Sequence, residues 1–140
     1  MKLRDYVFCD DIRHEQNNKI SLMGLYNDRI VFKVKSEKDL TWPQPIRLST
    51  FLLIEFAKED ARPDRFGFKL FLDDNVLADI GGPLKMDKEQ NMANISISGE
   101  GLPLKPGQIG FSLVLSHGQA TLFSQEVKAA LLVKTESAGA

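Results

Sequence analysis

The sequence predicts an all-β protein, a single antiparallel β-sandwich of about eight or nine strands, with a β-barrel as the alternative. Three observations support this prediction. Apolar residues recur at a period of two, which is typical of strands with one face on a core and one toward water. Turn residues separate the apolar runs at short intervals. No long amphipathic stretch of helical period alternates with these runs, as it would in an α/β protein.

Nine segments have the pattern of strands. Their ranges are 3–9, 19–26, 29–35, 46–57, 65–73, 76–81, 92–98, 108–116 and 120–134. The segment 46–57 is apolar on both faces near its middle, which predicts a central strand or one whose outer face is covered. The last segment contains good helix formers, but its apolar residues also fit strand spacing. We therefore predict one long strand with a bulge near Ser124–Glu126.

Turn chemistry predicts how the strands connect. Three hairpins are predicted, at Asn27-Asp28, at Asp73-Asp74-Asn75 and at His117-Gly118. Pro106-Gly107 predicts a turn that leads into a strand. Single helical turns are expected at residues 36–40 and 86–90.

Length and composition predict one domain. The chain has 140 residues, of which 43% are hydrophobic and 26% charged, as in an ordinary soluble globular protein. We expect the domain to span residues 1–134, and the small, polar residues 135–140 to form a flexible tail.

The apolar runs and the single cysteine suggest a compartment. The N-terminal apolar stretch Tyr6–Cys9 is shorter than a signal peptide needs, and no run approaches the roughly 20 residues of a membrane span. Cys9 has no partner for an internal disulfide. We therefore expect a cytoplasmic protein without a membrane partner.

The most unusual stretch is residues 9–26, CDDIRHEQNNKISLMGLY. It resembles the N-terminal pattern of a family of small uncharacterised bacterial β-sandwich proteins, C-x-D-x-R-x-E-x-x-x-K-x-S-L-x-G-x-Y. The matching residues are Cys9, Asp11, Arg13, Glu15, Lys19, Ser21, Leu22, Gly24 and Tyr26. The resemblance implies a β-rich fold and a bacterial source. It brings no biochemical function and no site residues.

The charged residues of this stretch have two interpretations. In the structural one, Arg13 pairs with Asp11 or Glu15 and Lys19 answers another carboxylate, which fixes the loop between two strands. In the functional one, the residues form a recognition loop at one end of the sandwich, where loops often bind partners. Trp42, in a loop between Thr41 and Pro43, is either a further contact or an anchor that covers the end of the core. The candidate recognition residues are Asp10, Asp11, Arg13, His14, Glu15, Lys19 and Trp42.

Other chemistries lack their usual residue sets. Cys9, His14 and His117 do not have the paired spacing of a zinc site. The sequence contains neither a G-x-S-x-G nucleophile elbow nor a G-x-x-x-x-G-K phosphate loop. A net charge of -1, without a cluster of basic residues, disfavours nucleic acid as a partner. We therefore expect no catalytic residue, metal or other cofactor.

These exclusions leave a non-enzymatic binding or assembly module that contacts an unknown protein partner through loops or a sheet edge. A small-ligand binder, for carbohydrate or calcium, is the alternative, and an enzyme with carboxylate chemistry comes third. The uncharged apolar segment 129–133 predicts either a strand in the middle of a sheet or an interaction surface. A symmetric homodimer is therefore a further expectation.

Overall fold

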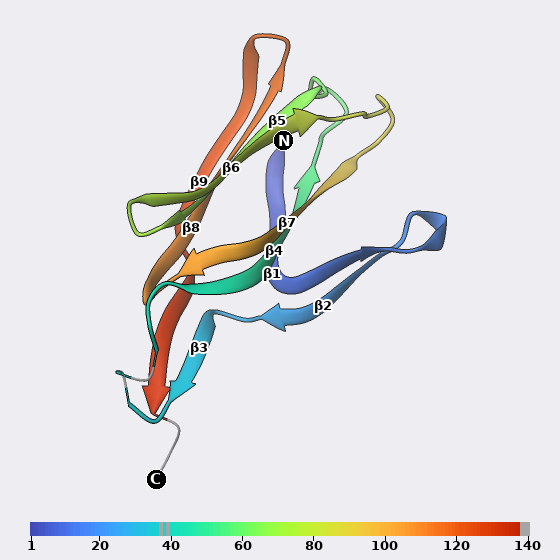
Figure 1. The fold of residues 1–140 in the computed structure, drawn as a ribbon. Helices are drawn as coiled ribbons and strands as arrows, with labels where there is room; N and C mark the ends of the chain where they lie inside the picture. Colours follow the sequence, from blue (N-terminus) through green and yellow to red (C-terminus); the bar gives the residue numbers. More distant parts are fainter. Residues whose placement is uncertain (37, 39, 138–140) are drawn as a thin grey trace.

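The computed structural model describes residues 1–36, 38 and 40–137, and these form a sandwich of nine β-strands (Figure 1). The strands are β1 (Lys2–His14), β2 (Ile20–Tyr26), β3 (Arg29–Val34), β4 (Gln44–Glu55), β5 (Arg65–Leu72), β6 (Asn75–Pro83), β7 (Met92–Leu104), β8 (Gly107–His117) and β9 (Ala120–Ser137). One 3-10 turn, η1 (Gln16–Asn18), lies between β1 and β2. The predicted all-β class is confirmed.

The strands form two separate sheets, so the sandwich, rather than the barrel, is the architecture. The four-stranded sheet has the order β2-β1-β4-β7, and the five-stranded sheet has the order β3-β9-β8-β5-β6. β4 lies inside its sheet, as the apolar segment 46–57 predicted. Neighbouring strands are antiparallel except β3 and β9, which run parallel. The expectation of a wholly antiparallel sandwich is wrong at this one pair.

The parallel pair arises because residues Asn27 and Asp28 connect the two sheets. A hairpin was predicted there, and that prediction is wrong. β2 belongs to the four-stranded sheet and β3 to the five-stranded sheet, so the chain crosses between the sheets at these two residues. The crossing leads directly onto β9, since the backbone N–H of Leu132 donates a 2.9 Å hydrogen bond to the carbonyl of Asp28. The other two predicted hairpins are present, as β5–β6 and β8–β9.

Several strands are longer than predicted. β1 continues past Cys9 to His14, and β9 continues to Ser137. Thr135 and Glu136 pair with Phe32 and Lys33 of β3, so residues 135–137 are strand rather than tail. Residues 138–140 lie outside the described residues. The helical turn expected at 36–40 also falls partly outside them. At 86–90 the structure has a non-helical turn in place of the expected helical one.

The core lies between the sheets and is centred on aromatic rings. Phe111 of β8 is fully buried and meets Tyr6 of β1 edge to face, with 5.1 Å between the ring centroids. It also contacts Phe8 of β1 and stacks with Phe68 of β5. The first two contacts join the sheets, because β1 and β8 belong to different ones. Leucines, isoleucines and valines fill the rest of the core, among them Leu52, Ile54, Leu72, Leu104, Ile109, Leu113, Leu115, Leu131 and Val133.

β9 has two irregularities, and they lie on either side of the predicted bulge, the first of them between the pairs Leu115–Phe123 and Ser116–Thr121. Ser124–Glu126 pair regularly with β8, whereas the register shifts again between the pairs Ile109–Leu131 and Phe111–Val127. Gly110 stands opposite this bulge. A Cβ atom there would lie 2.6 Å from the carbonyl oxygens of Val127 and Lys128, so the bulge requires a glycine on the facing strand.

Replacing Gly110 with Ala should therefore lower the free energy of unfolding by about 1–3 kcal/mol, the usual cost of overpacking a tight site. Backbone atoms form the obstruction, so no side chain can turn away to relieve it. Denaturant unfolding of both proteins measures the change. Gly67→Ala is the matched control, because nothing lies within 4 Å of a Cβ atom at that position. Equal losses in the two variants would contradict this account.

Candidate functional site

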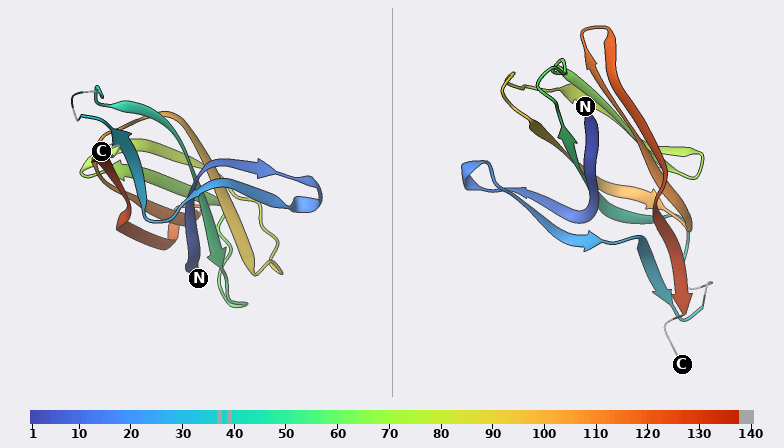
Figure 2. Two further views of the ribbon diagram at one scale, coloured as in Figure 1. Left: turned by 90° about the horizontal axis from the view of Figure 1, so that it is seen from below. Right: turned by 180° about the vertical axis from the view of Figure 1, so that it is seen from behind.

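Strands β1 and β2 form a hairpin that projects from the sandwich, which we call the arm (residues 10–25). β1 pairs with β4 only as far as Cys9, but its pairing with β2 continues to the pair His14–Ile20. Beyond Cys9 the arm is therefore a ribbon of two strands. Figure 2 shows it extending beyond the sandwich in both views.

Asp10 anchors the root of the arm. Its carboxylate accepts a 2.8 Å hydrogen bond from the Tyr26 hydroxyl, and its backbone carbonyl accepts one of 3.2 Å from Ser49 Oγ of β4. Gly24 has a φ of +69°, and a Cβ atom there would lie 2.8 Å from Asp10 Cγ. Position 24 therefore favours glycine twice, for its backbone conformation and for the space that Asp10 needs.

Burial and the Asp10 contact change two proton affinities at this root. Burial, followed by the hydrogen bond to the Asp10 carboxylate, raises the pKa of Tyr26 to about 12. Burial, followed by the charge of Asp10, raises the pKa of the Cys9 thiol. Cys9 is fully buried, so it packs as a small apolar residue rather than serving as a nucleophile.

Asp11 joins the arm to β4 through an ion pair with Arg47, and it also pairs with Arg13 within the arm. Arg47 of β4 approaches the Asp11 carboxylate at 3.0 Å and Arg13 approaches it at 3.5 Å. Of the two pairings predicted for Arg13, the one with Asp11 is present. Lys19 makes no ion pair with any residue that the structure describes. No pattern in the sequence predicts that Arg47 pairs with Asp11, because only the fold brings the two residues together.

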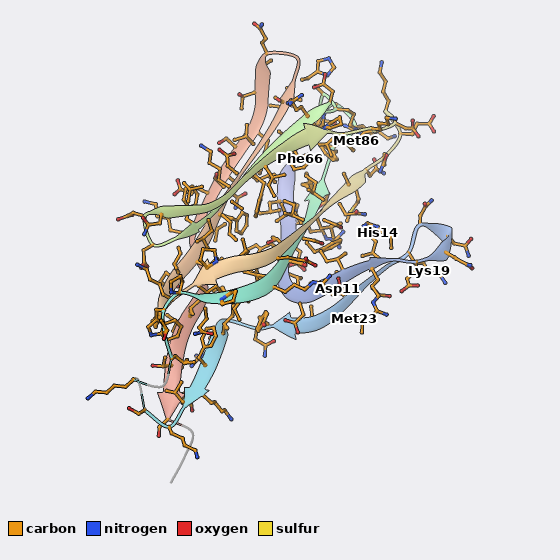
Figure 3. The ribbon with its side chains drawn as sticks, in the orientation of Figure 1. Asp11, His14, Lys19, Met23, Phe66 and Met86 are labelled. Carbon is orange, nitrogen blue, oxygen red and sulfur yellow. The ribbon has the colours of Figure 1, made fainter. Side chains whose placement is uncertain are left out.

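The predicted recognition residues do not form one site. Asp10 and Asp11 hold the root of the arm, while Arg13, His14, Glu15 and Lys19 are exposed toward its tip. Figure 3 shows Asp11, His14, Lys19 and Met23 distributed along the arm. Trp42 lies elsewhere, with its ring 5.3 Å from that of Phe32 in an edge-to-face contact. This contact supports the interpretation of Trp42 as a loop anchor.

A hollow that the sequence did not predict lies at one end of the sandwich. It has a volume of about 950 Å³ and is lined by residues 58, 60–64, 84–88, 90 and 117. We call it the loop groove, because the β4–β5 and β6–β7 loops form its walls and the β8–β9 hairpin closes it at His117. Met86, at this end of the molecule, is labelled in Figure 3.

Arg62 ties the two walls of the loop groove together. Its guanidinium donates to the carbonyls of Ala57 at 3.0 Å and Asp60 at 2.7 Å in its own loop. It also donates to the carbonyls of Gln90 and Lys88 in the opposite loop, at 3.2 Å each. The planar, multiply donating guanidinium is suited to such a bridge. The groove therefore has a defined shape without a ligand.

The carboxylates of Asp60 and Asp64 at the loop groove accept hydrogen bonds from backbone N–H groups. Asp60 accepts hydrogen bonds from the amine of Met1 at 2.6 Å and from the Ala57 N–H at 2.8 Å. These donors hold the pKa of Asp60 below its ordinary value. Asp64 accepts from the Gly118 N–H at 3.2 and 3.3 Å and lies 3.6 Å from His117 Nδ1.

The remaining charges of the loop groove are mixed, because Asp87 lines it together with three lysines, and Glu59 and Glu89 are exposed next to it. Lys58, Lys85 and Lys88 are exposed and make no ion pair with a described residue. Below them, Leu84 and Met86 are partly buried and pack against the core. No pattern in the sequence predicts this arrangement, because three segments far apart along the chain combine to make it.

The described residues contain neither a metal-binding cluster nor a membrane-spanning helix. Among the described residues, no group of three or more His, Cys, Asp or Glu side chains is placed to hold a metal ion. None of their helices is long and apolar enough to cross a membrane. A comparison of the chain with protein-family models and with curated protein sequences gives no match. The family resemblance of residues 9–26 therefore stays a prediction.

Replacing Asp10 with Asn should lower the pKa of Tyr26 from about 12 toward its ordinary value of 10.0, without reaching it. The amide removes the carboxylate charge, while the burial persists. Ultraviolet titration of the phenol measures the change in a Tyr6→Phe background, where Tyr26 is the remaining tyrosine. An unchanged pKa would contradict the contact between Asp10 and Tyr26.

The same shift predicts how stability depends on pH. Because the folded-state pKa of Tyr26 is raised, its contribution to stability is fully present below about pH 10 and is lost as the pH rises through about 12. This loss should be smaller in the Asp10→Asn variant, as measured by denaturant unfolding across that range.

Proposed function

We propose that the protein is a non-enzymatic binding module that holds a protein partner in the loop groove. This proposal rests on one observation: some charged residues of the groove bind its loops, whereas others are exposed and make no ion pair with a described residue. Arg62, Asp60 and Asp64 hold the loops, which fixes the shape of the groove before a partner arrives. Lys58, Lys85 and Lys88 remain available for contact. A preformed surface loses little conformational entropy on binding, so more of the contact energy appears as affinity.

The lining of the loop groove favours binding of a protein over catalysis. No Ser, Thr or Cys side chain lines it, so its single imidazole, His117, has no hydroxyl or thiol to activate there. No Trp or Tyr ring lines it as a platform for a sugar. Two of its three aspartates are engaged with backbone N–H groups, which leaves a weak oxygen set for calcium.

Cross-linking through the loop groove tests this proposal. A photoreactive benzophenone amino acid at Met86 should cross-link a specific protein in an extract of the source cells, because Met86 lines the groove. Excess unlabelled wild type should suppress the product, whereas excess Ala61→Trp, whose indole obstructs the groove, should not. The same photoreactive group at the exposed Asn94 of β7 is the control. The same product from Asn94, or equal competition by Ala61→Trp, would contradict the proposal.

The arm supports a second candidate function, self-association. Met23 and Leu25 of the arm are 43% and 58% exposed, which is high for large apolar side chains. They belong to β2, the edge strand of the four-stranded sheet. An edge strand with exposed apolar side chains is a template for pairing with another chain. We infer that two copies pair through β2 about a two-fold axis.

Light scattering tests this association. The wild type should be a dimer, and Leu25→Glu should be a folded monomer, because a carboxylate at the pairing edge is costly to bury. Val76→Glu is the matched control, since Val76 is 55% exposed on β6, the edge of the other sheet. That variant should stay dimeric. A monomeric wild type at high concentration would exclude the β2 interface.

A further inference from the structure

The four-stranded sheet is apolar at the centre of its outer face, the one turned away from the five-stranded sheet. Phe51 and Leu53 of β4 alternate with the core residues Leu52 and Ile54, so they point outward. Val7 of β1 pairs with Phe51 and shares this face. All three outward side chains are half-buried rather than covered. A strand that is apolar on both faces is normally covered on both, so this face lacks a layer.

The arm continues this apolar surface. Cys9 pairs with Leu25 of β2 on one side and with Ser49 of β4 on the other, which places exposed Leu25 one row beyond Val7. Exposed Met23 follows in the next row. Pairing of β2 with another strand would leave these side chains open, because they stand perpendicular to the sheet. We call the combined surface the outer strip: Val7, Met23, Leu25, Phe51 and Leu53.

The outer face of the five-stranded sheet differs. Its apolar residues do not form one surface, because a polar row lies between Phe71 and Val114. In this row Lys69 of β5 pairs with Asp79 of β6, and Glu126 of β9 continues it on the far side of β8. Charges of opposite sign along a row suit a face in contact with water. The outer strip is therefore the apolar face on which a partner would pack.

The charges around the outer strip are balanced at both of its ends. Lys2 lies 3.4 Å from Glu55, while Arg47 lies 3.0 Å from Asp11 and 3.7 Å from Glu100. Each end has two basic and two acidic residues, which are Lys2, Arg4, Asp5 and Glu55 at one end and Asp11, Arg13, Arg47 and Glu100 at the other. A second copy would therefore set no like-charged end against its own, whichever way it lies.

The size of the face also fits a second copy. Strands about 4.8 Å apart that rise about 3.4 Å per residue give the four strands a face of about 600 Å² over residues 47–55. Two such faces bury about 1,200 Å², the lower limit for a specific protein interface. A contact of this size should form at high concentration and dissociate on dilution.

We propose that a second copy of the chain covers the outer strip, with the two four-stranded sheets packed face to face about a two-fold axis. The β2 edges stay free in this contact. Together with the β2 pairing proposed above, on which this part rests, it joins two edge-paired dimers into a tetramer. The face contact itself does not require the edges to pair.

Light scattering over a range of concentrations tests this inference. The wild type should be a dimer when dilute and a tetramer when concentrated. Val7→Lys should stay a dimer throughout, because a lysine at the centre of the contact would be buried without a partner. Leu53→Lys should behave in the same way and serves as the second variant if Val7→Lys does not fold. Val114→Lys is the matched control, a half-buried valine on an inner strand of the other sheet, and should assemble like the wild type.

The outcomes separate this inference from the pairing of β2. If the concentrated wild type and Val7→Lys are equally dimeric, the face contact is wrong and β2 pairing stands. If Val7→Lys alone converts a wild-type dimer into a folded monomer, the face contact stands and β2 pairing is wrong. A wild type that is monomeric when concentrated would overturn both. Equal loss of tetramer in Val7→Lys and Val114→Lys would overturn the face contact.

Discussion

The packing of Phe111 between the two sheets is the contact on which the rest of the structure depends. The ring lies on β8 of the five-stranded sheet and meets Tyr6 and Phe8 of β1 in the four-stranded sheet. Each sheet is apolar on one face and is stable only when that face is covered. The strands that frame the loop groove extend from the same core. Asp64 immediately precedes β5, and His117 is the last residue of β8. The position of the groove therefore depends on the strands that form the core.

The period of the apolar residues was enough to predict the fold class, because that pattern reflects burial on one face. It was not enough where burial does not determine the structure. Residues 10–14 have charged side chains on both faces and resembled a loop, yet they continue β1 because pairing with β2 holds them. Thr135 and Glu136 are polar and resembled a tail, yet they continue β9 because pairing with β3 holds them in the sheet. Backbone pairing with a distant partner leaves no period in a sequence.

The candidate site shows the same division. The pairing of Arg13 with Asp11 was one of two predicted alternatives, because Asp11 and Glu15 each lie two residues from Arg13 in the sequence. The partner from β4, Arg47, was not, and neither was the loop groove. Arg62 illustrates the reason. In the sequence it is one arginine in a polar loop, whereas in the structure it binds carbonyls on two loops whose closeness follows from the sheet order. Such a role becomes visible only after the topology is known.

The parallel pairing of β3 with β9 has a consequence for how the protein forms. Arg29 pairs with Leu132, so the two partners stand near opposite ends of the sequence. During synthesis β3 leaves the ribosome long before the strand that completes its sheet exists. In that interval Ile30 and Val34, which are buried in the finished protein, remain exposed to water. Contacts between residues so distant in sequence slow folding, because the intervening chain must lose entropy before they form. β3 is thus a strand whose apolar side chains wait for a partner made about a hundred residues later, and the pairing of β9 with β3 completes that edge of the sheet.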